Sequence, residues 1–298
     1  MGTERMIAEP TSQFNFQENK VEVLTLDTLR RTHKENDVFG KPLKGLYHYE
    51  LIDLVAGMCA QHGLNYEIEE IFAAQNRNGN APGVTVLPQI EEQYGERAVE
   101  AHILRRVYAT IAIRDRETDE LTTNLVIAYH QDGIQMAIGP CVRICHNQCI
   151  LSPQRIVSTF GPNKVSFDVM SGTVAGWLTS FELDMTEDRE RIRRLKEKVL
   201  TAEDVLRLIG LLVTSRVAHD SQKLNRVLSE REKVKVYPLN QGQISEFTET
   251  LMMEQWMKGE LTAWDVYNIA TEIYKPGKTD IPVIMTQNSA MAEMLQAF

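Results

Sequence analysis

The sequence predicts an α+β fold, in which an N-terminal helix precedes an antiparallel β-meander and a helical C-terminal half follows it. Apolar residues recur with a helical period in residues 49–62, with a period of two in residues 103–144, and again with a helical period in the C-terminal half. We therefore expect a loosely ordered arm over residues 1–20, an α+β domain over residues 21–165, and a mainly helical region over residues 166–298 packed on it.

The expected α+β domain begins with a short strand near residues 21–26 and a helix over residues 49–62. Gly63 is expected to end this helix, because glycine is favoured just beyond a helix C-terminus. A strand over residues 65–75 follows, and residues 76–83 form a turn or loop since they are rich in Asn and Gly.

A meander of three strands is predicted over residues 103–115, 122–133 and 134–144, with turns at residues 116–120 and 130–133. Side chains alternate between the two faces of a strand, so the first strand is expected to have one apolar face and one polar, aromatic face. The apolar face carries Ile103, Val107, Ile111 and Ile113, and the other face carries Arg106, Tyr108 and Arg114.

The C-terminal half is predicted to contain a loop over residues 158–173 and then several helices with recognisable N-caps. Asp184 or Thr186 is the candidate cap of a first helix, over residues 185–199, and Thr201 is that of the second. Ser245 and Thr262 are the candidate caps of the third and fourth helices. A short helix over residues 288–298 is expected at the end of the chain. The fourth helix is expected to bury Trp264, Val266, Tyr267, Ala270 and Ile273.

The bulk composition excludes several classes of protein. The chain has 298 residues, of which 43% are hydrophobic, and no apolar run approaches the roughly 18–20 residues of a membrane helix. Residues 1–16 lack the apolar centre of a secretory signal, so we expect a cytoplasmic protein with reduced cysteines and no membrane partner. The net charge of −9 argues against indiscriminate coating of nucleic acid, although residues 101–235 carry 20 basic and 17 acidic side chains.

A group of arginines and one tyrosine is the candidate nucleic-acid-binding site. These residues are Arg105, Arg106, Tyr108, Arg114 and Arg143, which lie on or at the ends of the predicted meander strands. Arginines on an exposed sheet can neutralise phosphates while an aromatic ring stacks on a base, and this arrangement suits single-stranded DNA. The alternative is that the charges protect a sheet edge from aggregation.

The stretch CVRICHNQC, residues 141–149, raises the alternative of a metal-dependent enzyme. Its weak candidate ligands are Cys141, Cys145, His146 and Cys149. The two outer cysteines would lie about 26 Å apart in a straight strand and about 12 Å apart in a helix, so three sulfurs could reach one ion only if the stretch contained a turn. A spacing of four also suits three core residues on one side of a strand or helix. We therefore expect no metal and no cofactor.

A histidine near a carboxylate is the minimum for acid–base or nucleophilic catalysis, and His130, Asp132 and His146 fall close to the same predicted strands. No nucleophile elbow, phosphate loop or paired-carboxylate motif accompanies them. The Asp132–Gly133 pair is also explained by the turn that joins two strands, because both residue types tolerate positive φ. The sequence therefore favours no enzymatic activity and leaves the question open.

Several segments together resemble protein families without an established activity that are carried by bacterial phages, plasmids and integrative elements. The segments are YHYELIDLVAG, AYHQDGIQMAIGPCVRICHNQCIL, LTAEDVLRLIGLL, YPLNQGQISEF and LTAWDVYNIATEIYK, and the second contains the family pattern of Arg143, Cys145 and Asn147. The resemblance covers most of residues 40–298 and implies an accessory protein of a mobile element.

The order of elements also resembles, more distantly, that of Rad52-like single-strand annealing proteins. Those proteins run from a Tyr-led helix through a curved antiparallel meander to further helices, and they bind single strands along a basic groove as oligomeric rings. This resemblance implies a homo-oligomer that binds single-stranded DNA and assists annealing or replication. A second hypothesis is a protein-binding module whose acidic surfaces engage a host or phage protein and interfere with a host process.

Overall fold

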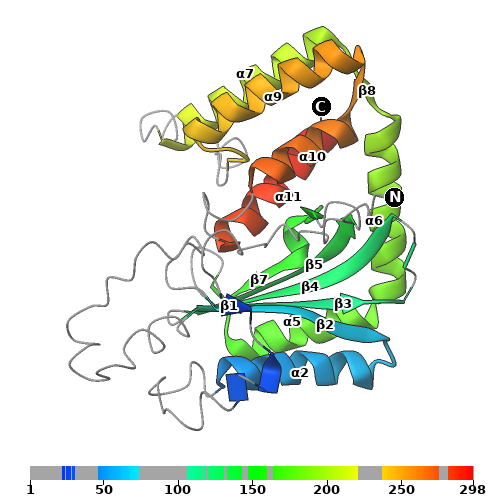
Figure 1. The fold of residues 1–298 in the computed structure, drawn as a ribbon, viewed down its shortest axis with the longest axis vertical. Coiled ribbons are helices and arrows are strands. Elements are labelled where there is room, and N and C mark those ends of the chain that lie inside the picture. The colour runs from blue at the N-terminus through cyan, green and yellow to red at the C-terminus, as the bar shows by residue number, and fades with distance from the viewer. Residues whose placement is uncertain are drawn as a thin grey trace, which may run out of the picture.

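The computed structural model has the α+β architecture predicted from the sequence, with an N-terminal helix, an antiparallel meander and a helical C-terminal half (Figure 1). It describes residues 22–23, 25–27, 29–30, 46–73, 106–115, 117–118, 120–130, 133–142, 147–159, 164–220, 237–274 and 281–297. The arm predicted over residues 1–20 lies outside these ranges. Among the described helices, none is long and apolar enough to cross a membrane.

An antiparallel sheet forms the centre of the described structure. Its strands are β1 (Glu22–Val23), β2 (Tyr66–Ala73), β3 (Arg106–Ile113), β4 (Leu121–His130), β5 (Gly133–Val142), β6 (Asn147–Gln148) and β7 (Ile156–Ser158). Strands β1 to β5 lie in chain order, and β6 and β7 both pair with β5. Because β3, β4 and β5 each pair with their successor in antiparallel register, the predicted meander is confirmed.

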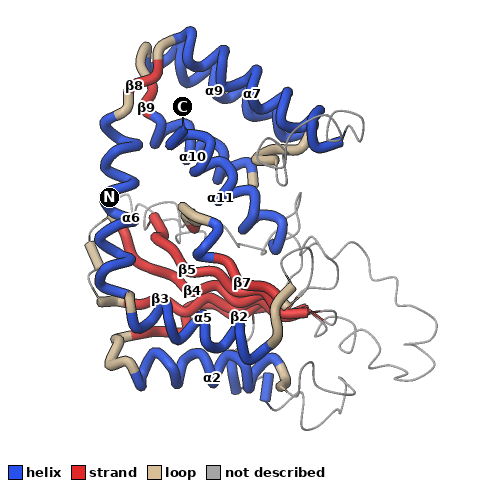
Figure 2. The backbone as a smooth tube through the Cα atoms, turned by 180° about the vertical axis from the view of Figure 1, so that it is seen from behind, coloured by secondary structure: helices blue, strands red, loops and turns tan. Residues whose placement is uncertain are grey.

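Helices cover both faces of this sheet (Figures 1 and 2). The helices are α2 (His48–Gln61), α5 (Phe167–Thr179), α6 (Phe181–Glu197), α7 (Ala202–Asp220), α9 (Gln241–Lys258), α10 (Ala263–Ile273) and α11 (Ile281–Ala297). In the view of Figure 1, α2 and α5 lie below the sheet and α10 and α11 above it. Helices α7 and α9 run side by side beyond α10, and α6 runs along one side of the molecule toward them.

The lower face of the sheet is strongly apolar. Val107, Ile111 and Ile113 on β3 belong to one buried cluster with Leu51 and Val55 of α2. This confirms the predicted apolar face of the first meander strand for its three described residues. Full burial of such a side chain contributes about 1.5–3 kcal/mol, so this cluster is a main source of stability.

The upper face is made of smaller and more polar side chains. Thr110, Asn124 and Gln135 point there and are buried. Asn124 is in register with Ala112 and Gly139, and Gln135 is in register with Ala128. The second apolar cluster joins this face to α10, whose predicted inward residues Trp264, Val266, Tyr267, Ala270 and Ile273 are all buried. The sheet is therefore covered on both sides, and no broad polar face of β3 or β4 is left open in the described structure.

Two predicted helix starts are confirmed. Thr262 accepts a hydrogen bond from the Asp265 amide, and Asp265 accepts one from the Thr262 amide, so the two residues form a capping box. Thr201 and Asp204 make the same reciprocal bonds at the start of α7.

Other expected boundaries in the C-terminal half are wrong. Ser245 lies inside α9, which Asn240 caps instead through a capping box with Gln243. Helix α6 begins after Ser180 rather than at Asp184 or Thr186, and α11 begins at Ile281 rather than near residue 288. Helix α5 occupies part of the predicted loop, because Ser166 caps it and four apolar side chains on one of its sides are buried, namely Met170, Val174, Trp177 and Leu178. That burial outweighs the poor helix propensity of its glycines.

Candidate functional site

The predicted nucleic-acid-binding residues are only partly within the described structure. Arg105 and Arg143 lie outside it, and Arg106 is placed only by its backbone at the start of β3. Tyr108 is described and is 2% exposed, within the upper apolar cluster. A ring in this position offers no open face to a base, which differs from the stacking role expected of it. The reason is tertiary: helices from the distant C-terminal half cover this face of the sheet.

Arg114 is surrounded by carboxylates. Its guanidinium lies 2.8 Å from Glu67, 2.8 Å from Glu69 and 3.4 Å from Glu117. Partial burial disfavours the charged form, but the hydrogen bond to Glu67 and the nearby carboxylates outweigh it and raise the pKa of Arg114 above its ordinary value. A phosphate would therefore have to compete with three carboxylates for this side chain.

The sheet register separates the candidate arginines into two groups. Arg106 pairs with His130 at one end of β3, and Arg114 follows Ile113 at the other end. Eight residues of strand separate these positions by about 26 Å. Arg105 and Arg143 lie outside the described residues. The two candidate arginines that are placed thus lie at opposite ends of β3, and nucleic-acid binding by the set remains a prediction.

The cysteine-rich stretch folds back on itself. Strand β5 ends at Val142, and Val142 and Cys141 pair with Asn147 and Gln148 of β6, so a turn lies inside the stretch. Cys141 and Cys149 are buried free thiols, whereas Cys145 and His146 lie outside the described residues. Within the part of the chain that the structure describes, no three His, Cys, Asp or Glu side chains are grouped to hold a metal ion.

The predicted acid–base pair cannot be placed by its side chains. His130 ends β4 and pairs with Gly133 through the backbone, which fits a tight connection between β4 and β5. Its side chain and Asp132 lie outside the described residues. Catalysis by these residues therefore remains only a prediction.

The segment after the turn is anchored on the upper face of the sheet by a chain of buried hydrogen bonds. The Gln148 side chain donates to the backbone oxygens of Asn124 and Gly139 at 3.3 and 3.1 Å. Asn288 of α11 donates to the Gln148 backbone oxygen at 3.0 Å and accepts a hydrogen bond from the Tyr267 hydroxyl at 2.9 Å. These bonds connect the sheet, α10 and α11, so they fix how the helical half sits on the meander.

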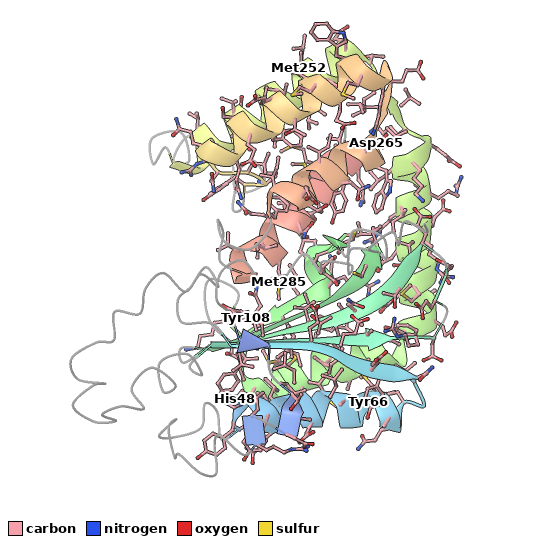
Figure 3. The ribbon with its side chains drawn as sticks, viewed as in Figure 1. His48, Tyr66, Tyr108, Met252, Asp265 and Met285 are labelled. Atoms are coloured by element: carbon pink, nitrogen blue, oxygen red, sulfur yellow. The ribbon has the colours of Figure 1, made fainter. Side chains whose placement is uncertain are left out.

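The α7–α9 helix pair carries large apolar side chains on the side away from the core. We call this set the outer face, and it consists of Leu206, Leu211, Val213 and Val217 on α7 and Met252, Met253, Trp256 and Met257 on α9. Figure 3 labels Met252 on α9. Trp256 is 90% exposed and Met257 is 78% exposed. Single exposed apolar residues are ordinary, whereas clusters of them are typical of interaction surfaces.

The spacing of these residues explains why both helices are apolar on two sides. Val205, Leu208 and Leu212 bury one stripe of α7, and Phe247 and Leu251 do so for α9. The exposed residues form second stripes with spacings of four and seven, namely Met252 with Trp256, Met253 with Met257, and Leu206 with Val213. The inner stripe packs each helix on the core, whereas the residues of the outer stripe are exposed.

Acidic side chains accompany the apolar residues on α9. Glu246, Glu249, Glu254 and Glu260 lie on or just after this helix and are exposed or half-exposed. Lys258, the basic residue of α9, pairs with Glu254 at 2.9 Å. The α9 side of the outer face therefore combines methionines, a tryptophan and an excess of negative charge.

The outer face was not predicted from the sequence. The signal for it is local: the run LMMEQWM near the end of α9 is apolar around more of the helix than a single buried stripe requires. That signal becomes informative only once Leu251 is known to face the core.

No family model, curated protein or solved structure matches the chain.

Proposed function

We propose that this protein is a protein-binding module that engages its partner through the outer face of α7 and α9. The observation that carries the proposal is the exposure of Met252, Met253, Trp256 and Met257 on one helix. Tryptophan and methionine are enriched at the centres of protein interfaces, where they bury much apolar area without fixed polar requirements.

The size of the surface supports the same function. Its eight side chains are each at least 41% exposed, whereas exposed apolar residues on a monomer are ordinarily scattered singly. Combined with the mobile-element resemblance of the sequence, this surface supports an accessory protein that acts on a host or phage protein.

A pull-down from nuclease-treated bacterial lysate tests this function. The bait is the full chain, compared with the double variant Met253→Glu/Trp256→Glu, which places two charges in the centre of the outer face. Because both side chains are more than half exposed, the variant should keep the melting temperature of the wild type and lose the partner, with a drop in affinity of at least about 100-fold.

The matched control is Leu183→Glu on α6, whose side chain is 64% exposed but lies outside the outer face. This variant should retain the partner at the wild-type level. Retention of the same partner by the double variant would contradict the proposed function, and so would its loss from the Leu183→Glu variant.

Binding to single-stranded DNA, which the arginines of the meander predict, needs a separate test. A labelled oligonucleotide is titrated with the protein at low and at moderate salt, and binding through phosphates requires an affinity that falls steeply with salt. The variant Arg105→Ala/Arg106→Ala should weaken such binding more than Arg114→Ala, because Arg114 is held by three glutamates. No binding at micromolar protein would rule out this function.

A further inference from the structure

We infer that the occupant of the outer face is a basic amphipathic helix of the partner protein. The inference rests on the proposed function and adds the chemistry of the ligand. Its starting point is the combination of four exposed apolar residues on α9 with Glu246, Glu249 and Glu254 on the same helix and Glu260 just after it.

The apolar part of the surface is suited to a helix. Met252 with Trp256 and Met253 with Met257 are pairs spaced by four, so they form two short parallel rows along α9. Rows of this spacing are the ridges between which the side chains of another helix pack. Methionine is unbranched and flexible, so it adapts to the apolar stripe of a helix without demanding one sequence.

The negative charge of the surface favours a partner segment with positive charge. Four glutamates and one lysine accompany the apolar rows of α9, and the lysine is paired with Glu254. Helix α7 does not offset this excess, because Glu203 and Asp204 in its first turn oppose Arg207 and Arg216 further along. Lysines and arginines flanking an apolar stripe would therefore be attracted, and acidic helices would be repelled.

The same charge argues against a second copy of this chain as the occupant. Two outer faces packed with α9 against α9 would bring their glutamates together, and like charges placed opposite each other at an interface disfavour association. It also argues against a membrane surface, since anionic lipids attract basic segments rather than acidic ones.

Trp256 supplies a direct reporter for the test. The chain has three tryptophans, and the other two, Trp177 and Trp264, are 6% exposed whereas Trp256 is 90% exposed. Occupation of the outer face should therefore shift tryptophan emission to shorter wavelength and reduce quenching by acrylamide. The probe is a designed amphipathic helix of leucine and lysine, about five turns long, compared with a helix in which glutamate replaces every lysine.

The leucine–lysine helix should bind, shift the emission, and bind about tenfold more weakly when salt rises from about 50 to about 200 mM. The glutamate helix should not bind. Met253→Glu keeps Trp256 as the reporter and should abolish the shift, and Glu246→Gln/Glu249→Gln/Glu254→Gln should weaken binding about tenfold at low salt. The Leu183→Glu variant, followed with a labelled peptide, should bind as the wild type does.

Each other result contradicts the inference in a distinct way. Equal binding of both helices would remove the role of charge, and binding of neither would exclude a helical occupant, while in both cases the pull-down still decides the proposed function. An emission shift that grows with protein concentration alone and is lost in Met253→Glu would assign the surface to a second copy. A shift with phosphatidylcholine vesicles but not with the helix would assign it to a lipid surface.

Discussion

Replacing Arg155 by methionine should lower the free energy of unfolding by about 3–5 kcal/mol at pH 8, the cost of breaking a buried ion pair. Arg155 follows Pro153 in a short 3-10 helix before β7, and its side chain is 9% exposed. It lies 2.6 Å from Asp184 and 3.7 Å from Asp188, both on α6. Methionine fills a similar volume but leaves Asp188, which is 3% exposed, without its main counter-ion.

The size of this effect should depend on pH. Burial raises the pKa of Asp188 from 3.8 to about 6, and Arg155 and Arg191 offset that rise only in part. Since the folded state holds this proton more tightly than the unfolded state, the carboxyl makes folding less favourable as pH rises from about 4 to about 6. Without Arg155 the ionised form is disfavoured further, so the difference between wild type and variant should be largest above pH 7 and should narrow below pH 6.

Urea unfolding at pH 5, 6, 7 and 8 measures this difference. The matched control is Arg193→Met on α6, which breaks ion pairs with Glu190 and Glu197 at the surface. It should leave the free energy of unfolding close to the wild-type value at every pH, because exposed ion pairs contribute little. The loss of unfolding free energy in Arg155→Met could be as small as in the control, or it could be independent of pH. Either result would show that the ion pairs of Arg155 with Asp184 and Asp188 do not couple α6 to the segment before β7.

Gly139→Ala should destabilise the protein by about 3 kcal/mol, because an added methyl group has no space. A Cβ at this position of β5 would lie only 2.1 Å from the backbone oxygen of Cys149. The Cys149 segment cannot easily move away, since the Cys149 amide donates to the Pro140 oxygen at 2.7 Å and the Gln148 side chain bonds to the Gly139 oxygen. Thermal unfolding should therefore show a melting temperature several degrees below that of the wild type.

The control for this experiment is Gly172→Ala in α5, where nothing lies within 4 Å of an added Cβ. That substitution should stabilise the protein by about 0.5–1 kcal/mol, because alanine favours the helix more than glycine does. An unchanged melting temperature for Gly139→Ala would mean that the chain crosses β5 less closely than the structure describes.

The sheet could be predicted from the sequence because its signals are local. Alternating apolar residues in β3, β4 and β5, joined by short turn sequences, specify antiparallel neighbours without any knowledge of the rest of the chain. Thr262 and Asp265 likewise specify the start of α10 within four residues. Helix α5 was missed because its SGTVAG centre has weak helix propensity, and it forms only through burial of residues such as Trp177 against the lower face.

The candidate site depends on contacts that the sequence does not display. Alternation correctly separates Tyr108 from Val107, but whether Tyr108 meets solvent depends on helices that follow far along the chain. In the same way, the three glutamates that hold Arg114 come from β2 and the turn after β3. The outer face of α9 becomes visible only after the register of its buried stripe is known, because the helix is apolar on two sides.

Helices α7 and α9 each have a buried apolar side and an exposed apolar side. The buried side is constrained by the stability of the fold, and the exposed side is constrained by partner binding. Leu208, Phe247 and Leu251 are tied to the core, so substitutions there change stability. Met253 and Trp256 touch nothing in the interior, so substitutions there can alter the choice of partner while the fold persists. A scan of every substitution in these helices, read separately for abundance and for binding, should give two profiles with the same period of about 3.6 residues and opposite phase. The protein could thus acquire a new partner through substitutions on the outer face while its fold stays the same.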